Sequence, residues 1–236
     1  MNTEKAELFT PAPEWSGRSD GPGPEHARWH SVINQSTDSP APITLLGFAS
    51  DEGVLRNGGR QGAAAGPAAL RSALGSLAVH HKHALADAGT ITTQADDLDG
   101  AHDALSDKVQ KLVEAGTLPI ILGGGHETAF GSHRGLYRAV GATKIVNLDA
   151  HFDLRRADQA TSGTPFKQIS ELTDDFDYTV LGISRPNNTA VLFDEAESLG
   201  VAITLDEELL NLSPAECGEL AARATEGKDK VHLSID

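Results

Sequence analysis

The chain has 236 residues and is 39% hydrophobic, enough for a packed core and too much for a chain that is disordered throughout. Its 34 acidic and 19 basic residues give a net charge of −15, which argues against nucleic acid and against an anionic membrane surface as partners. The single cysteine, Cys217, excludes an internal disulfide framework. The sequence shows no apolar signal segment and no membrane-spanning run, so we expect a cytoplasmic protein.

Residues 1–42 are rich in proline, glycine, serine and charged side chains. This composition predicts an irregular N-terminal arm, with a short helix around "EHARWHSVI". Two tryptophans, Trp15 and Trp29, indicate that the arm packs onto the body of the protein, which we expect to comprise residues 43–236.

Short apolar runs alternate with helical patterns from residue 43 onward. The runs predicted to be strands are 43–48, 118–123, 144–149, 178–183, 201–205 and 231–235. Helices are predicted between them, at 66–78, 100–116 and 213–227 among others. Strands that are apolar on both faces and separated by single helices are typical of a parallel sheet with helices on both sides. The sequence therefore predicts a three-layer α/β fold.

Ligands of such folds bind beyond the carboxyl ends of the strands, so the residues that follow each strand are the candidates for a site. Ionisable residues follow three of the predicted strands. They are His126 in "GGGHE", then Asp149, His151 and Asp153 in "DAHFD", and finally Asp236 in "SID".

The two longer motifs differ in how specific they are. "GGGHE" matches neither a P-loop nor a dinucleotide fingerprint, and a glycine-rich turn with a helix-starting histidine remains an alternative for it. In "DAHFD", positions two apart point the same way if the segment is extended, so we expect Asp149, His151 and Asp153 to converge. Without a cation such a group would be poorly solvated and mutually repulsive. A solvated surface strand would instead require the preceding "KIVN" to be exposed.

Together these residues make a candidate metal centre with two histidines and three aspartates. Carboxylate-rich sites with few imidazoles and no thiolate favour hard divalent ions, Mn²⁺ ahead of Zn²⁺. Three aspartates are able to bridge, which indicates two metal ions, and a pair of ions roughly 3.5–4 Å apart holds a hydroxide between them.

These motifs, in this order, resemble the three metal motifs of the ureohydrolases, the arginase and agmatinase family. Within that family the chain is most similar to the formimidoylglutamases, through "RNGGRQGAAAGPAALRSAL", "GGGHE" and "TSGTPFKQI". The resemblance implies an arginase-like fold, a homo-oligomer and two Mn²⁺ ions per complete site. It implies that His126, Asp149, Asp153 and Asp236 hold one ion, and that Asp149, His151 and Asp236 hold the other.

The family's third motif continues as Ser-x-Asp-x-Asp, and its second aspartate lies two positions beyond Asp236. The resemblance therefore leads us to expect a domain truncated at the third metal motif, with the C-terminal part of the fold missing. A catalytically incomplete form that binds metal poorly is one hypothesis that follows.

The resemblance implies hydrolysis of N-formimino-L-glutamate to L-glutamate and formamide, in histidine breakdown, by a hydroxide that bridges the metal ions. Asp153 would transfer the proton to the leaving amine, and His151 is the second candidate catalytic residue. The two carboxylates of this substrate need cationic partners, for which Arg155 and Arg60 are candidates, although each is also explained as an ordinary surface charge. Ser162, Gly163 and Thr164 are candidate hydrogen-bond donors, and a simple turn is the alternative for "SGTP".

Two other enzyme classes remain to be distinguished. An agmatinase or guanidino-acid hydrolase would share the metal motifs, but Arg155 opposes a cationic substrate. A metallophosphoesterase uses similar motifs in the reverse order, which counts against it.

Overall fold

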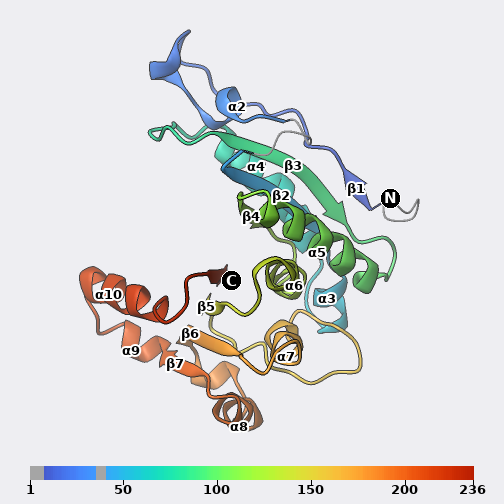
Figure 1. The fold of residues 1–236 in the computed structure, drawn as a ribbon, viewed down its shortest axis with the longest axis vertical. Helices are drawn as coiled ribbons and strands as arrows, with labels where there is room; N and C mark the ends of the chain where they lie inside the picture. The colour runs from blue at the N-terminus through green and yellow to red at the C-terminus, as the bar shows by residue number, and fades with distance from the viewer. Residues whose placement is uncertain (1–7, 36–40) are drawn as a thin grey trace.

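A computed structural model describes residues 8–35 and 41–236 of the chain (Figure 1). Its strands are β1 (Phe9–Thr10), β2 (Ile43–Ala49), β3 (Leu85–Thr92), β4 (Leu118–Leu122), β5 (Lys144–Leu148), β6 (Asp177–Ile183), β7 (Ala202–Leu205) and β8 (Val231–Ile235). Its α-helices are α2 (Trp29–Val32), α3 (Glu52–Arg56), α4 (Gly66–Gly75), α5 (Leu98–Glu114), α6 (Thr128–Val140), α7 (Pro165–Ser170), α8 (Ala190–Ser198), α9 (Asp206–Leu209) and α10 (Pro214–Ala224). Short 3₁₀ helices are η1 (Pro24–His26), η2 (Ala63–Ala65) and η3 (Arg185–Asn187).

Within the described residues the strands form two four-stranded sheets. Their orders are β1-β3-β2-β4 and β7-β6-β5-β8. Every pairing is parallel except that of β1 with β3. The predicted α/β architecture with parallel strands is confirmed, although the strands are divided between two sheets.

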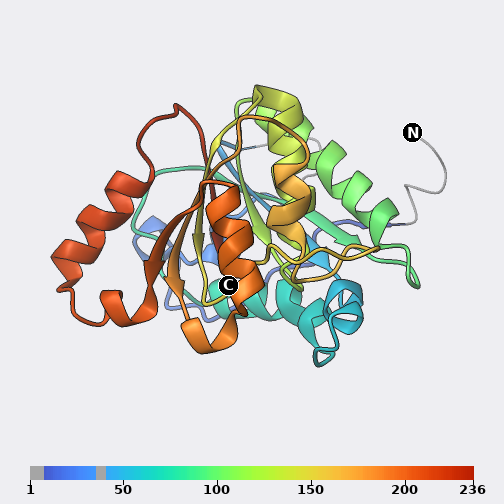
Figure 2. The same cartoon turned by 90° about the horizontal axis from the view of Figure 1, so that it is seen from below.

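Both faces of the central strands are covered, as their apolar sequences require. In the first sheet, Leu46 packs in a cluster with residues of α5, while Leu45 packs on the other side with Trp15 of the arm. In the second sheet, Val180 packs with residues of α7 and α8, while Leu181 packs with a residue of α10. Figure 2 shows α8, in orange, and α10, in red, on different sides of these strands.

Strand β3 was not predicted, because a carboxylate interrupts its apolar sequence. Asp87 is completely buried in the middle of the strand. Arg71 of α4 donates to both of its oxygens, at 2.7 and 2.8 Å, and Trp15 Nε1 donates to Oδ2 at 2.9 Å. Because these donors neutralise and solvate the carboxylate, the strand is able to enter the core.

The N-terminal arm lies along the first sheet (Figure 1). The Trp15 and Trp29 rings stack with their centroids 6.4 Å apart. The helix expected near 25–33 is divided between η1 and α2. Residues 1–7 and 36–40 of the predicted arm lie outside the described residues.

Two edge strands leave apolar side chains exposed. β4 ends the first sheet and exposes Leu118 and Ile120, and β8 ends the second sheet and exposes Leu233 and Ile235. In the residues covered by the structure, no helix combines the length and the apolar character needed to cross a membrane.

Candidate metal centre and adjoining pocket

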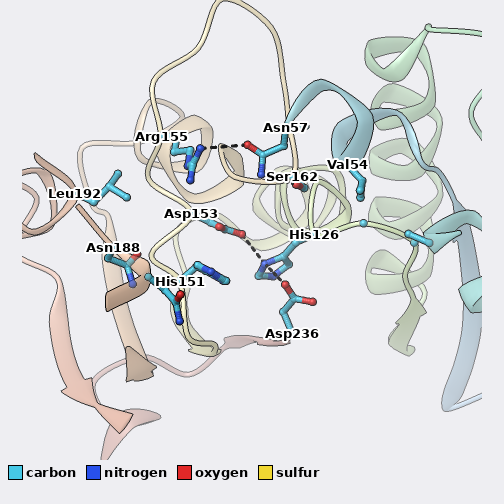
Figure 3. A pocket seen from close by; sticks show the side chains of 14 residues that line it. Val54, Asn57, His126, His151, Asp153, Arg155, Ser162, Asn188, Leu192 and Asp236 are labelled. Carbon is cyan, nitrogen blue, oxygen red and sulfur yellow. Dashed lines mark hydrogen bonds and ion pairs between the residues drawn. The ribbon is translucent and has the colours of Figure 1, made fainter. Parts of the chain in front are cut away.

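Three loops meet at the carboxyl ends of β4, β5 and β8, where the sequence predicts the site. His126 follows β4, Asp149 and Asp153 follow β5, and Asp236 follows β8. β5 and β8 are paired with Leu148 opposite Ile235, so the aspartates that come next lie side by side. One ligand atom from each of the four residues lies within 4.8 Å of the others. Figure 3 shows three of the four, His126, Asp153 and Asp236, at the pocket that they help to line.

The imidazole of His126 is at the centre of the cluster. Its Nδ1 lies 2.7 Å from Asp153 Oδ2, 3.2 Å from Asp149 Oδ2 and 3.5 Å from Asp236 Oδ2. Burial alone would lower the pKa of His126, but the hydrogen bonds and charges of the aspartates outweigh burial and raise this pKa to about 10. The cluster therefore stabilises a positive charge at its centre.

The pKa values of the two aspartates that follow β5 are shifted in opposite directions. Burial would raise the pKa of Asp149, but hydrogen bonds from His126 and from the backbone N–H of His151 bring it below its usual value. At Asp153 burial is stronger than the hydrogen bond to His126, and the pKa of this carboxyl is raised.

The segment 149–153 is not extended. The prediction that Asp149, His151 and Asp153 point the same way, as alternate residues of an extended segment, is therefore wrong. Asp153 has a φ of +50°, in the left-handed region, which turns its carboxylate back toward His126. His151 lies outside the four-residue cluster; its side chain is 51% exposed, and its Nδ1 is 3.5 Å from Asp149 Oδ1. Asp149 thus presents one oxygen to each histidine.

The donor set fits a hard divalent cation. Three carboxylates and one imidazole, with no thiolate, are ligands that suit Mn²⁺. A cation placed among them would take over the charge-balancing role that a protonated imidazole otherwise fills.

A pocket of about 300 Å³ lies beside the cluster. Among its lining residues are His151, Arg155, Ser162, Asn57 and Asn188. Arg155 is exposed and forms no ion pair with any described residue; its Nη1 donates to Asn57 Oδ1 at 3.5 Å. The pocket thus carries an unpaired guanidinium beside a group of carboxylates.

The other predicted substrate-binding residues lie in different surroundings. Arg60 is exposed in the loop between α3 and η2 and is not among the described residues that line the pocket. Gly163 lies against Arg155, since a Cβ at position 163 would come within 3.0 Å of Arg155 Cδ. Thr164 is buried, and its hydroxyl bonds to Thr161 in its own loop and to Gln168 of α7.

Four residues that support the site were missed by the sequence analysis. Asn188 donates to the carbonyls of Ala150 and Ser184, at 2.8 and 2.9 Å, and so fixes the segment that carries His151. Ser234 Oγ lies 2.8 Å from His126 Nε2. Glu127 accepts a hydrogen bond from the N–H of Gly53 in α3. Asn57 donates a hydrogen bond to the hydroxyl of Ser162. Asn57 and Asn188 carry no sequence signal for such contacts, whereas Ser234 and Glu127 stand in the motifs "SID" and "GGGHE", which assign no contact to them.

Comparison with known proteins gives a consistent result. The arginase family model matches residues 41–236. A formimidoylglutamase of Corynebacterium efficiens is 48% identical over 94% of this chain and 72% of its own length. One of Citrobacter koseri is 46% identical over 94% of this chain and 74% of its own length.

Solved structures agree in fold. A Trypanosoma cruzi formiminoglutamase crystallised with Mn²⁺ is 30% identical and superposes with a TM-score of 0.75, over 83% of this chain and 70% of that one. The proclavaminate amidino hydrolase of Streptomyces clavuligerus, 21% identical, shares the fold with a TM-score of 0.75 over 95% of this chain and 75% of its own. By family match, identity and architecture, this chain belongs to the arginase family.

Proposed function

We propose that the protein is a hydrolase of linear amidine C–N bonds that converts N-formimino-L-glutamate and water to L-glutamate and formamide, a step of histidine degradation. The names of its relatives support this reaction. The observation that carries the choice of substrate is Arg155, which lines the pocket next to the aspartate cluster and forms no ion pair with the residues that the structure describes.

A guanidinium at this place favours an anionic substrate. It offers a planar pair of N–H donors that matches a carboxylate, and it would repel the ammonium group of agmatine. The chain has a net charge of −15, so a cation without an acidic partner in residues 8–35 and 41–236, beside four clustered candidate ligands, is a specific feature of the pocket.

We propose two Mn²⁺ ions per complete site. His126, Asp149, Asp153 and Asp236 would hold one ion, and Asp149, His151 and Asp236 would contribute to the other. The orientation of Asp149 supports a bridging role, because its Oδ2 faces His126 and its Oδ1 faces His151. When bound, the ions would activate water as the nucleophile.

The protein groups would orient the substrate and move the proton. Arg155 would hold a substrate carboxylate, with Ser162 beside it, so that the formimino carbon faces the aspartate cluster. Asp153 would take a proton from the attacking water at Oδ2 and give it to the glutamate nitrogen as the C–N bond breaks. His151, at the pocket wall, is the second proposed catalytic residue.

The test compares Arg155→Ala with the wild-type protein loaded with Mn²⁺. We expect the loss of the guanidinium to lower kcat/KM for N-formimino-L-glutamate by about 100-fold or more, the scale of a lost charged hydrogen bond. Formation of formamide and glutamate is the measurement.

The neighbouring Arg156→Ala is the matched control. Arg156 is 72% exposed and pairs with Glu195, so its removal should leave turnover unchanged. Turnover of agmatine that exceeds turnover of N-formimino-L-glutamate in the wild-type protein would contradict the proposed substrate.

A further inference from the structure

Asn57 lies at the edge of the pocket, next to α3 and within reach of Arg155 and Ser162. It follows the last residue of α3, and its side-chain amide extends over the pocket (Figure 3). Its Nδ2 donates to Ser162 Oγ at 3.1 Å, and its Oδ1 accepts from Arg155 Nη1 at 3.5 Å. One amide thus joins the two side chains that we propose for substrate binding.

Hydrogen bonds fix the main chain that carries this amide. The carbonyl oxygen of Gly53 accepts from the N–H groups of both Asn57, at 3.1 Å, and Ser162, at 3.0 Å. The N–H of Gly53 donates to Oε1 of Glu127 at 3.1 Å, and Glu127 is fully buried and directly follows His126. A Cβ at Gly53 would come within 2.4 Å of Glu127 Cδ, so only glycine permits this approach.

The chemistry of an amide matters at this position. A carbonyl oxygen accepts a hydrogen bond from the guanidinium without cancelling its charge, whereas a carboxylate of the same shape would form an ion pair with it. Since Arg155 has no carboxylate partner among the described residues, its contact with the Asn57 amide leaves the charge of the guanidinium available to a ligand.

We propose that Asn57 is a positioning and specificity-determining residue, which holds the Arg155 guanidinium toward the pocket while keeping it free to bind a substrate carboxylate. This role rests on the proposed function, in which Arg155 binds an anionic substrate. Asn57 acts through Arg155 and Ser162, and it takes no part in the chemical step.

Asn57→Asp tests this role with almost no change in shape. The new carboxylate should occupy the guanidinium and raise KM for N-formimino-L-glutamate by about tenfold or more, with kcat at saturation within about twofold of wild type. Asn57→Ala removes the orienting contacts without adding a charge, so its KM should rise less.

A double-mutant cycle separates this role from a general effect of charge. If the carboxylate acts through Arg155, Asn57→Asp should change KM by less than about twofold in the Arg155→Ala background. Asn187→Asp, which adds the same charge to another residue of the pocket lining, should raise KM less than Asn57→Asp does. Equal effects of Asn57→Asp in both backgrounds would overturn the proposal, as would an unchanged KM.

A binding measurement distinguishes failure of this inference from failure of the proposed function. L-glutamate keeps both carboxylates, so its dissociation constant can be measured by calorimetry on the Mn²⁺-loaded protein without turnover. Binding that weakens about tenfold in Asn57→Asp, in a protein that does not hydrolyse N-formimino-L-glutamate, would support Asn57 and overturn the proposed reaction. Hydrolysis with glutamate binding unaffected by Asn57→Asp would overturn the inference alone, and a wild-type protein that neither binds glutamate nor hydrolyses the substrate would overturn both.

Discussion

Ser234 lies on the opposite side of the His126 ring from the three carboxylates. Its Oγ is 2.8 Å from Nε2, while Nδ1 faces the aspartates. In the neutral imidazole only one ring nitrogen carries a proton. A hydrogen bond from Nε2–H to Ser234 therefore leaves the lone pair of Nδ1 directed into the cluster, where a cation would bind.

Removal of this hydroxyl should weaken metal binding. We expect Ser234→Ala to raise the dissociation constant for Mn²⁺ about 10- to 100-fold, the usual cost of losing the group that orients a histidine ligand. Ser234→Thr, which keeps the hydroxyl, should lose less, and Ser198→Ala on the surface of α8 serves as a control. Calorimetric titration with Mn²⁺ measures the effect, and equal affinities for Ser234→Ala and wild type would show that Ser234 does not orient His126.

At the scale of residues, the sequence predicts the identity of the clustered residues better than the backbone conformation that brings them together. Motif order identifies His126, Asp149, Asp153 and Asp236, which the fold gathers within 4.8 Å; their role as ligands remains a prediction. The extended geometry was wrong because Asp153 adopts a left-handed conformation, which depends on the tertiary surroundings of the loop. Contacts such as that of Asn57 with Arg155 join residues 98 positions apart, and no local pattern encodes them.

At the scale of elements, local sequence patterns were reliable where an apolar run or a helix cap marks the element by itself. The strand at 231–235 was predicted at its observed bounds, and the helix expected from 213 begins as predicted, with Ser213 and Glu216 forming a capping box. β3 was missed because its stability depends on Arg71 reaching Asp87 from another element. Sheet division likewise depends on pairings between distant strands, which a single sequence does not specify.

The edge strands β4 and β8 bear on whether copies of the chain associate. Among the described residues no strand pairs with the outer side of either, and both expose apolar side chains, including Leu118 and Leu233, which are 60% and 56% exposed. Such edges pair with other chains unless a charge interrupts them. We propose that these edges are the contact surface of the homo-oligomer that the family resemblance implies.

We therefore expect the double variant Leu118→Lys and Leu233→Lys to self-associate less than wild type, because lysines on an edge strand oppose pairing. Sedimentation velocity over a range of protein concentrations would measure this. Val191→Lys is a matched control, since Val191 is 67% exposed but lies on α8 rather than on a strand. The same distribution of species in the double variant and wild type would exclude these edges as the contact.

At the scale of the whole molecule, buried neutral histidines link folding to pH. His102 is 1% exposed, stacks on Phe48 and donates from Nε2 to the carbonyl of Glu127 at 2.9 Å. Its Nδ1 has no hydrogen-bond partner among the described residues, so a second ring proton would be buried without an acceptor. Burial, aided by the charge of Arg134, lowers the pKa of His102 from 6.5 to about 4. Burial also lowers the pKa values of His133 and His232, whose rings pack against each other.

These shifts predict that stability decreases in mild acid. Between pH 6.5 and pH 4 the unfolded chain binds a proton at each of these histidines and the folded chain does not, so the free energy of unfolding rises with pH across this window. The contribution of His102 is fully present above pH 6.5 and is lost as the pH falls toward 4, to a total of about 3 kcal/mol. Urea unfolding at pH 7.5 and pH 5.0 should show this decrease in the free energy of unfolding. His102→Gln should make the decrease smaller by the contribution of one histidine. His80→Gln, at an exposed position, is the control and should leave the decrease unchanged. If stability were equal at the two pH values, the histidines would have to be accessible to protons in the folded state, and the close packing of His102 of α5 against Phe48 of β2 and Phe130 of α6 would be incorrect.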